Sequence, residues 1–428
     1  MSNKEEDIIE QVLQEEKMKQ IQSVSTDLDS DITNHHNSSD DSIKNHSVKS
    51  PQNISIIVNE TKNYFTFMNC PSLKENPSLA SFSFSTYNDE TLVKLSPYLI
   101  KEQNGSRYLQ KRIINDIHFA NEVFFPYFKQ HFLDKDIYEL ICDQFGNYLF
   151  QSLIESLEPK NIYTLISMLK QNIYEISINT YGTRVIQKLI EVISNQDDLL
   201  KKFISIIHPI VMKLLDESHG NHIIQKYLEY VKNPKYKYFL NKLIKQNFKK
   251  IATHKFGCLT IQKFLAESGP NEKRTNFELI KKNIVNIITN QYGSYVFQYI
   301  IEKEDEEYKI EILNSILPYI LKICKTKYSS NAIEKCFELH CAQIQERLIN
   351  KICENNNNIK KLILDPYGNY IIQKALCVCD QKHYTQIISV IGSNTEKIKK
   401  VNFGYKLISK LLVTHHTLAD YIITSSKF

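Results

Sequence analysis

Short polar and flat side chains recur in this chain at one fixed spacing, and their chemistry suits recognition better than catalysis. One instance has an amide, a flat aromatic ring and a second amide at Asn147, Tyr148 and Gln151. On a helix, side chains four residues apart lie about 5–6 Å from each other, so the two amides could meet one planar hydrogen-bonding edge. The ring between them could lie against the face of the same planar group. A nucleobase offers both such an edge and such a face.

The triplet recurs in eight copies of a longer motif: an aromatic residue, glycine, a small or amide residue, a flat residue, two apolar residues and glutamine. Ser329 replaces glycine in one copy, and the glycine positions are 105, 146, 182, 220, 257, 293, 329 and 368. They lie 36 to 41 residues apart, and a weaker ninth copy contains Gly404. A period near 36 residues kept over this length predicts stacked repeats, each of which needs its neighbours to cover its apolar face.

The candidate recognition residues occupy the same three positions in every copy. They are Ser106, Arg107 and Gln110; Asn147, Tyr148 and Gln151; Thr183, Arg184 and Gln187; Asn221, His222 and Gln225; Cys258, Leu259 and Gln262; Ser294, Tyr295 and Gln298; Ser330, Asn331 and Glu334; Asn369, Tyr370 and Gln373. Six of the eight middle residues are Arg, Tyr or His, the types that stack on bases. Lysine follows the Gln or Glu in six copies, where it could reach phosphates or form a solvated face: Lys111, Lys188, Lys226, Lys263, Lys335 and Lys374.

Apolar spacing of three and four residues places these triplets on helices. Each unit has a first apolar run, such as residues 162–169, then a shorter run, such as residues 173–178, and then the glycine motif that opens another helix. Within one motif helix, residues 149, 150, 153 and 154 form an apolar face, and the triplet 147, 148 and 151 lies on the other side. No run shows sustained alternation of apolar and polar residues, so an all-α fold is predicted. Loops are expected at 268–271 and 354–358.

Composition divides the chain into four parts. Residues 1–62 hold 6 Lys and 12 Asp or Glu, a net charge of −6, and are predicted to be a disordered acidic and polar tail. Residues 63–88 regain aromatic side chains and are predicted to form an N-terminal cap on the first repeat. Residues 89–382 hold the eight repeats, and residues 383–428, with the degenerate ninth motif, are predicted to form the C-terminal cap.

Charge and cysteine content narrow the classes of function. The formal net charge is +5, so the chain after residue 62 carries +5 − (−6) = +11, which suits a polyanionic partner. No apolar run reaches the roughly 20 residues that cross a bilayer. The nine irregularly spaced cysteines suit a reducing compartment, so a soluble cytoplasmic protein without a membrane partner is expected.

Catalytic and metal-binding patterns are missing from the sequence. It has no phosphate-cradling glycine loop and no pair of histidines flanking a glutamate. The cysteines between residues 336 and 379 have spacings that match no usual zinc ligand set. We therefore expect no enzyme, no cofactor, no metal and no small-molecule substrate.

The eight motif copies resemble the RNA-reading helices of the Pumilio/FBF (PUF) family, over about residues 85–428. The resemblance implies a curved right-handed α-solenoid of eight Pumilio repeats with a cap at each end. It also implies sequence-specific binding of single-stranded RNA in the 3′ untranslated regions of messenger RNA. Members of this kind lower translation or messenger stability by recruiting protein co-repressors such as a deadenylase complex.

The resemblance further implies one base for each triplet, with the C-terminal repeat on the 5′ base. Asn with Gln implies uracil, a small residue with Gln admits adenine, and Ser330 with Glu334 implies guanine, because a carboxylate accepts both N–H groups of the guanine edge. Ser294 with Gln298 has room for adenine, but the family takes uracil at the third base. The expected RNA is therefore UGUAUAUA. Leu259 replaces the usual Arg, which predicts a loss of roughly 1 kcal/mol and looser choice at the fourth base.

Two other classes of protein remain open from the sequence. One is a nucleolar PUF-like protein that binds structured or ribosomal RNA without a base code. The other is a protein-only α-solenoid scaffold of the HEAT or armadillo type, although such a scaffold has no need of a stacking residue beside every glutamine.

Overall fold

A computed structural model describes residues 84, 87–132, 134–339 and 341–425 of the chain. Within these residues the chain forms helices joined by turns and contains no strand. The all-α fold predicted from the sequence is confirmed over this part. The predicted acidic tail at 1–62 and nearly all of the predicted cap at 63–88 lie outside the described residues, so those two predictions stay predictions.

Each repeat contains a first helix, a short helix and a motif helix, in that order. In one repeat, the three predicted runs are α10 (Pro159–Leu169), α11 (Ile173–Ile178) and α12 (Gly182–Ile193). The other motif helices are α6 (Gln103–Asn115), α9 (Gly146–Ser156), α15 (Gly220–Tyr230), α18 (Gly257–Ala266), α20 (Gly293–Lys303), α23 (Lys327–Glu338), α26 (Gly368–Val378) and α29 (Gly404–Thr414).

The remaining helices precede or follow these motif helices. The first helices are α5 (Asp89–Leu99), α7 (Phe125–His131) after the π-helical turn η1 (Phe119–Phe124), α13 (Asp197–Ile207), α16 (Pro234–Gln246), α21 (Glu306–Ile316), α24 (Ala342–Ile352) and α27 (Gln381–Ser393). The short helices are α8 (Asp134–Ile141), α14 (Val211–Leu215) after η2 (His208–Ile210), α17 (Phe248–Ala252), α22 (Ile320–Ile323) after η3 (Leu317–Tyr319), α25 (Asn356–Ile363) and α28 (Thr395–Lys399). One long helix, α19 (Pro270–Thr289), replaces a first and a short helix, and α30 (Thr417–Ser425) follows the last motif helix.

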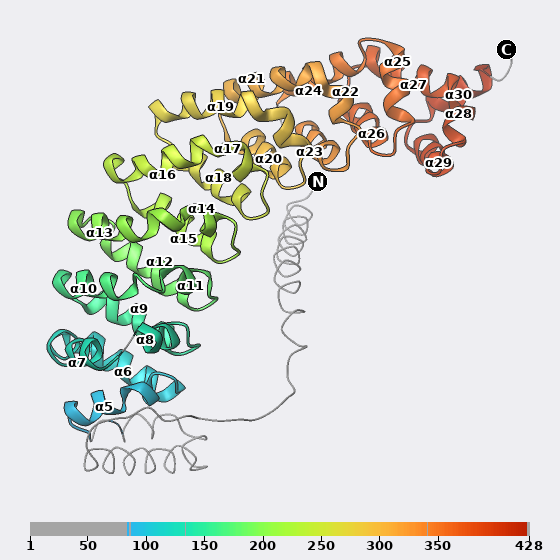
Figure 1. The fold of residues 1–428 in the computed structure, drawn as a ribbon. Coiled ribbons are helices and arrows are strands. Elements are labelled where there is room, and N and C mark those ends of the chain that lie inside the picture. Colours follow the sequence, from blue (N-terminus) through green and yellow to red (C-terminus); the bar gives the residue numbers. More distant parts are fainter. Residues whose placement is uncertain (1–83, 85–86, 133, 340, 426–428) are drawn as a thin grey trace, which may run out of the picture. The chain divides into compact units, whose positions relative to one another are not determined.

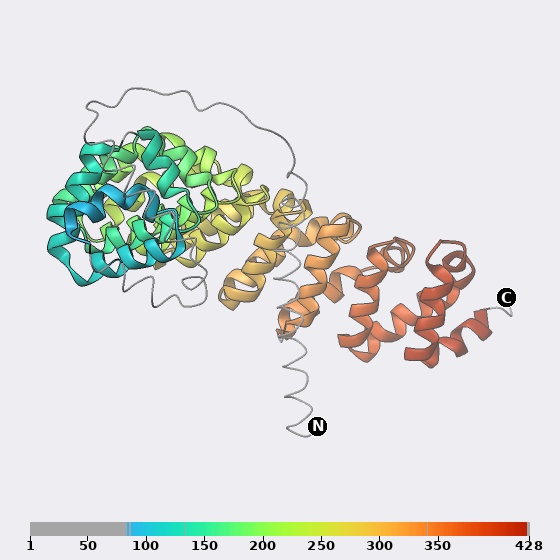
Figure 2. The ribbon, with the colours of Figure 1, turned by 90° about the horizontal axis from the view of Figure 1, so that it is seen from below.

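The motif helices pack side by side in chain order, as Figure 1 shows. Direct contacts join α6 to α9, α9 to α12, α12 to α15, α15 to α18, α18 to α20, α20 to α23 and α23 to α26. In the view of Figure 2, the orange and red units of the C-terminal half also follow one another side by side. This packing places the eight triplets on neighbouring helices of one row.

The core runs through the stack on the apolar faces of these helices. In α9, the four apolar residues of the predicted face, Leu149, Phe150, Leu153 and Ile154, are each 0% exposed, which confirms that face. Buried leucine and isoleucine of neighbouring repeats belong to the same core. Each repeat therefore depends on the next for burial, as expected of a solenoid.

Glycine opens most motif helices because the preceding short helix lies directly against this position. A Cβ on Gly182 would lie 2.6 Å from the carbonyl oxygen of Ile176. Ser329 occupies the same position in α23, and its hydroxyl donates to the carbonyl of Ile323, so a polar side chain fits there by bonding that oxygen.

Two predicted loops are partly helical, and one predicted boundary falls inside a helix. Residues 356–358 were expected in a loop but begin α25, because the Asn355 side chain accepts from the backbone N–H of Asn358 and caps this helix. The predicted start of the C-terminal cap, residue 383, falls just inside α27 rather than at its beginning. The loop expected at 268–271 lies between α18 and α19, although α19 already begins at Pro270.

The described helices include none that combines the length and the apolar character needed to span a bilayer.

Candidate nucleic-acid interface

All eight triplets lie at the N-terminal ends of the motif helices and share one pattern of exposure. The first residue is buried, the second is exposed and the third is half-buried. Asn147, for example, is 0% exposed and Tyr148 is 46% exposed. The sequence prediction that the first residue shares the accessible side is therefore wrong. This residue directly follows the glycine and lies beneath the turn that enters the helix, so the turn covers it.

The buried asparagine orients the glutamine in the repeats expected to bind uracil. Asn147 Nδ2 donates to the carbonyls of Asp143 at 2.9 Å and Gln144 at 3.0 Å, and its Oδ1 accepts from Gln151 Nε2 at 3.1 Å. The same arrangement joins Asn221 to Gln225 and Asn369 to Gln373. Nε2 of the glutamine thus faces the asparagine, and Oε1 lies on the opposite side of the amide, where a ring N–H can donate to it.

Two hydroxyl residues hold their glutamines in a similar way and also connect neighbouring repeats. Gln110 Nε2 donates to Ser106 Oγ at 3.1 Å, and Gln187 Nε2 donates to Thr183 Oγ1 at 3.2 Å. The two hydroxyls in turn donate to carbonyls in the turn of the following repeat, at Phe145 and His219. Ser106 and Thr183 therefore orient their glutamines, as asparagine does in the three repeats above.

The fifth and sixth repeats lack this support. Cys258 Sγ donates to the Lys255 carbonyl, and Ser294 Oγ donates to the Gln291 carbonyl at 3.0 Å. Among the described residues, neither forms a hydrogen bond to its glutamine, Gln262 or Gln298. These are the repeats whose sequences depart from the family pattern, at Leu259 and Ser294.

Glu334 gives the seventh repeat a different chemistry. Its side chain is half-buried, and burial raises its pKa, while Lys374 and Lys335 lower the pKa and Glu338 raises it. Within the described part of the chain, no donor bonds its carboxylate, and the Ser330 hydroxyl donates instead to the Lys327 carbonyl. Both carboxylate oxygens are therefore available to a ligand with two adjacent N–H groups.

The middle residues form an exposed series along the row of motif helices. Leu259, Tyr295 and Tyr370 are 44%, 56% and 51% exposed. Arg184 Nη1 donates to the Tyr148 hydroxyl at 3.2 Å, so the stacking residues of adjacent repeats are within contact distance. Burial and the nearby His219 lower the pKa of His222, so this ring is a neutral flat surface near neutral pH.

A hollow between the first two repeats brings one set of these side chains together. Its volume is about 440 Å³.

 The hollow of 440 Å³ is lined by Ser106, Arg107, Gln110 and Tyr148, among others. A flat ligand there would meet the Gln110 amide together with one cationic and one aromatic stacking residue.

The lysines that follow the Gln or Glu mostly form ion pairs between repeats. Lys188 Nζ lies 2.8 Å from Glu155, Lys263 lies 3.0 Å from Glu229, and Lys374 lies 2.8 Å from Glu338, in each case on the preceding motif helix. Lys226 is paired in the same way with Glu191, whereas Lys335 pairs with Glu338 of its own helix. A phosphate would have to replace these carboxylates, and only Lys111 of the six has no ion pair among the described residues.

Sequence reasoning missed Lys410, which extends the row of triplets. On α29, Lys410 Nζ donates to Gln373 Oε1 at 2.8 Å, beside a hollow of about 270 Å³ lined by Tyr370 and Phe403. The signal was present, because Lys410 occupies in the ninth motif the position that lysine occupies in six of the other eight.

The residues that cap the motif helices were also missed. Asp143, Asn179, Asn290 and Asp365, three positions before the glycine, each accept from two backbone N–H groups of the turn. An Asp or Asn at this fixed position was visible in the sequence as the usual cap of a helix N-terminus.

The cysteines are not gathered into a site. The described residues contain no group of three or more His, Cys, Asp or Glu side chains placed to hold a metal ion. Cys336 is buried, and burial raises the pKa of its thiol to about 12.

Comparison with known proteins identifies the repeat. A profile for the Pumilio-family RNA binding repeat matches residues 136–169, 172–198, 247–275, 283–317, 319–353 and 358–391. The solved Puf4 RNA binding domain bound to HO endonuclease RNA 3′ UTR recognition sequence is 30% identical, with a TM-score of 0.63, over 73% of this chain and 97% of that chain. The chain belongs to the Pumilio family. The α-solenoid of Pumilio repeats implied by the sequence resemblance is thereby confirmed, and the family is one of RNA-binding repeats.

Two relatives extend well beyond the region that matches this chain. Pumilio homolog 12 of Arabidopsis thaliana is 29% identical over 320 residues, covering 73% of this chain and 52% of the homolog. A Pumilio domain-containing protein of Schizosaccharomyces pombe is 28% identical over 350 residues, covering 81% of this chain and 49% of that protein. The chain therefore spans about half the length of these Pumilio relatives.

The six matched segments leave out the motif copies at Gly105 and Gly220. In the structure, α6 and α15 take their places in the row of motif helices, and their triplets have the same buried, exposed and half-buried pattern. The described residues therefore contain eight helices of the Pumilio motif type, in agreement with the count made from the sequence.

Proposed function

We propose that this Pumilio protein binds single-stranded RNA in messenger 3′ untranslated regions, one base per repeat, with UGUAUAUA as the preferred sequence. The observation that carries the proposal is the uniform triplet: in eight neighbouring helices an exposed middle residue stands beside a half-buried Gln or Glu. Bases can stack on the exposed residues while their edges meet the amides or the carboxylate. The Puf4 domain in the solved relative is bound to a 3′ UTR recognition sequence, which supports this class of ligand.

The side-chain geometry supports particular bases at several repeats. Where asparagine holds the glutamine, Oε1 can accept the N3–H of uracil. At the seventh repeat, the carboxylate of Glu334 has two oxygens without a donor among the described residues, which suits the two N–H groups of guanine. Guanine at the second base from the 5′ end follows if the C-terminal repeat binds the 5′ base.

Titration of the full chain with two RNA oligonucleotides tests the proposal. Fluorescence anisotropy with UGUAUAUA and with a copy whose UGU is changed to ACA should show much weaker binding of the altered RNA. Each mismatched base should cost roughly 1–3 kcal/mol, by analogy with other sequence-specific nucleic-acid complexes. Equal affinity for the two RNAs would contradict the base preference.

We also propose that the protein acts in the cytoplasm and lowers the translation or stability of bound messengers by recruiting co-repressors such as a deadenylase complex. This part rests on the family resemblance and on the charged helices outside the row of triplets. A reporter messenger with UGUAUAUA in its 3′ UTR should have a shorter poly(A) tail and a lower protein yield than the same messenger with ACAAUAUA. A fluorescent fusion should be found outside the nucleus. Identical fates of the two messengers, or a nucleolar fusion, would contradict the regulatory role.

A further inference from the structure

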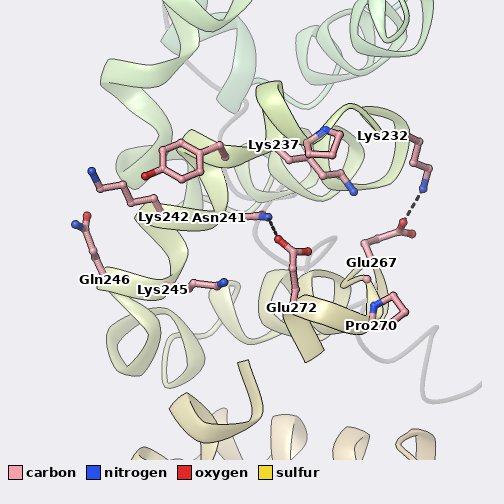
Figure 3. A pocket seen from close by; sticks show the side chains of 12 residues that line it. Lys232, Lys237, Asn241, Lys242, Lys245, Gln246, Glu267, Pro270 and Glu272 are labelled. Atoms are coloured by element: carbon pink, nitrogen blue, oxygen red, sulfur yellow. Dashed lines mark hydrogen bonds and ion pairs between the residues drawn. The ribbon is translucent and has the colours of Figure 1, made fainter. Parts of the chain in front are cut away.

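A second hollow lies away from the triplets, between α16 and the N-terminal end of α19. Its volume is about 720 Å³. Figure 3 shows Lys237, Lys242 and Lys245 around this hollow. None of the 24 triplet residues lines it, and its walls come from first helices rather than motif helices.

Three of the four lysines that line this hollow have no ion pair among the described residues. The Lys237 side chain is only 9% exposed and its Nζ forms no ion pair or hydrogen bond within that part of the chain, but this atom is not among the buried ones and is open to solvent. Lys242 and Lys245 likewise have no ion pair within the described part of the chain. Burial lowers the pKa of Lys237 and the neighbouring Lys232 lowers it further, whereas Glu267 and Glu272 raise it.

The two carboxylates beside the lysines have other partners. Glu267 pairs with Lys232 at 2.6 Å and with Lys263 at 3.3 Å. Glu272 accepts from Asn241 Nδ2 at 2.9 Å, and Figure 3 shows this bond at the hollow. The hollow therefore keeps an excess of positive charge, with the unpaired ammonium group of Lys237 at its wall, which favours an anionic ligand.

The hollow also has an apolar surface beside these lysines. Tyr238, which is 66% exposed, and the two prolines Pro234 and Pro270 also line the hollow. Flat apolar rings next to lysines match a ligand that carries carboxylates and apolar side chains together. Glu267 and Glu272 in the wall would repel a continuous phosphate chain, but a peptide can direct its backbone N–H groups at them.

We propose that the hollow between α16 and α19 binds an acidic segment of a partner protein, with one carboxylate on Lys237 and an apolar side chain on Tyr238 and the prolines. This adds a peptide-binding site to a protein whose proposed function concerns RNA. The two sites use different helices, so their ligands do not compete.

Selection from a random peptide library displayed on phage tests this site with the full chain as the target. Two variants report on the hollow: Lys237→Met removes the charge of this mostly buried side chain, and Lys242→Glu reverses the charge of an exposed lining residue. Lys235→Glu is the matched control, because Lys235 is an exposed residue of α16 that does not line the hollow. Enriched peptides are then synthesised and titrated against all four proteins with and without UGUAUAUA.

The site predicts enrichment of peptides rich in Asp and Glu that also contain apolar residues. Their affinity should fall about tenfold or more in Lys237→Met and Lys242→Glu and stay unchanged in Lys235→Glu. Lys237→Met should leave the melting temperature nearly unchanged, because the ammonium group forms no ion pair or hydrogen bond among the described residues; a structural role for this group would lower the melting temperature. Neutral or basic peptides, equal affinity for all the proteins, or competition by the RNA would overturn the proposal. RNA affinity itself should be the same in all four proteins, so failure of this site is distinguishable from failure of the RNA proposal.

Discussion

Glu334 illustrates how much one side chain can decide in the proposed complex. A carboxylate accepts two N–H groups of guanine, whereas a glutamine offers one acceptor and one donor. Its half-buried position has a second consequence, because burial raises its pKa above the ordinary value of 4.5. Protonation therefore begins at a higher pH than for an exposed glutamate.

The preference for guanine at the second base should depend on pH. As pH falls towards the raised pKa of Glu334, this group takes up a proton and loses one acceptor, so affinity for UGUAUAUA should fall towards that for UUUAUAUA. Because the folded state holds this proton more tightly than the unfolded state, the stability that this group contributes is lost as pH rises through its folded-state pKa. Titration at several pH values measures the ratio of the two affinities. Glu334→Gln should show a low ratio at every pH, and a pH-independent high ratio in the wild-type protein would argue against this role.

The sixth repeat offers a gain-of-preference test. Ser294 donates to the Gln291 carbonyl and leaves Gln298 unsupported. Ser294→Asn should place an amide where Asn147 holds Gln151, and so orient Gln298 for uracil. Discrimination between UGUAUAUA and UGAAUAUA should rise by about 1 kcal/mol, the usual value of a hydrogen bond, in paired anisotropy titrations. The same substitution at Ser106, whose glutamine is already held, should change the adenine at the last base instead. Unaltered discrimination at the third base in Ser294→Asn would show that this support does not matter.

At the scale of helices, the turn before each motif helix determines how deeply the residues of the triplet are buried. The glycine lets the short helix approach, and the Asp or Asn three residues earlier caps the new helix. In the four repeats with this Asp or Asn, both features hold the first triplet residue beneath the turn. The other four repeats have Glu102, Glu217, His254 and Thr326 at the capping position, and their first triplet residue is buried too.

A methyl group at the glycine should disturb this contact. Gly182→Ala places a Cβ 2.6 Å from the Ile176 carbonyl oxygen and 2.9 Å from Cys142 Sγ. Overpacking of this kind typically costs about 1–3 kcal/mol, so chemical denaturation should show a loss of that size. Gly269→Ala is the control, because nothing lies within 4 Å of a Cβ there. Equal stability of the two variants would mean that the short helix simply moves aside.

Inter-repeat ion pairs also operate at the scale of helices, and they separate the lysines into two groups. Lys111 has no ion pair among the described residues, whereas Lys374 pairs with Glu338. If RNA phosphates are neutralised by unpaired lysines, Lys111→Ala should reduce the slope of log affinity against log salt concentration by about 0.7, the value for one contact on a single strand. Lys374→Ala should change the slope less, because its ammonium group already neutralises a carboxylate. Titrations of UGUAUAUA at four salt concentrations measure both slopes, and the reverse order would refute this assignment.

Across the whole molecule, regular spacing made the fold predictable. The period near 36 residues and the apolar spacing within each unit identified the three helices of a repeat, and residues 149, 150, 153 and 154 are buried as predicted. The short loops were harder, because Asn355 could either extend a loop or cap a helix, and only the packing of α25 decides between them.

The residues of the site could be predicted from the sequence, but their burial could not. Spacing places Asn147 and Gln151 on one side of a helix, yet burial of Asn147 depends on the turn from Asp143 that covers it, and helical spacing does not contain that information. Four of the lysine ion pairs could not be predicted for a similar reason, since their glutamates lie on the preceding repeat. The hollow beside Lys237 arises where α16 meets α19, which involves two units of the stack.

A change of base preference by design tests the central claim, that one triplet selects one base, most directly. In the double variant Ser330→Asn with Glu334→Gln, the first and third triplet residues of the seventh repeat become Asn and Gln, as in the second and fourth repeats. Anisotropy titrations of the wild-type protein and this variant with UGUAUAUA and UUUAUAUA measure the preference at the second base alone. The account predicts that the wild-type protein prefers UGUAUAUA and that the variant prefers UUUAUAUA, with other positions unchanged. A variant that still prefers guanine at the second base, or whose preference changes at a different base, would contradict it.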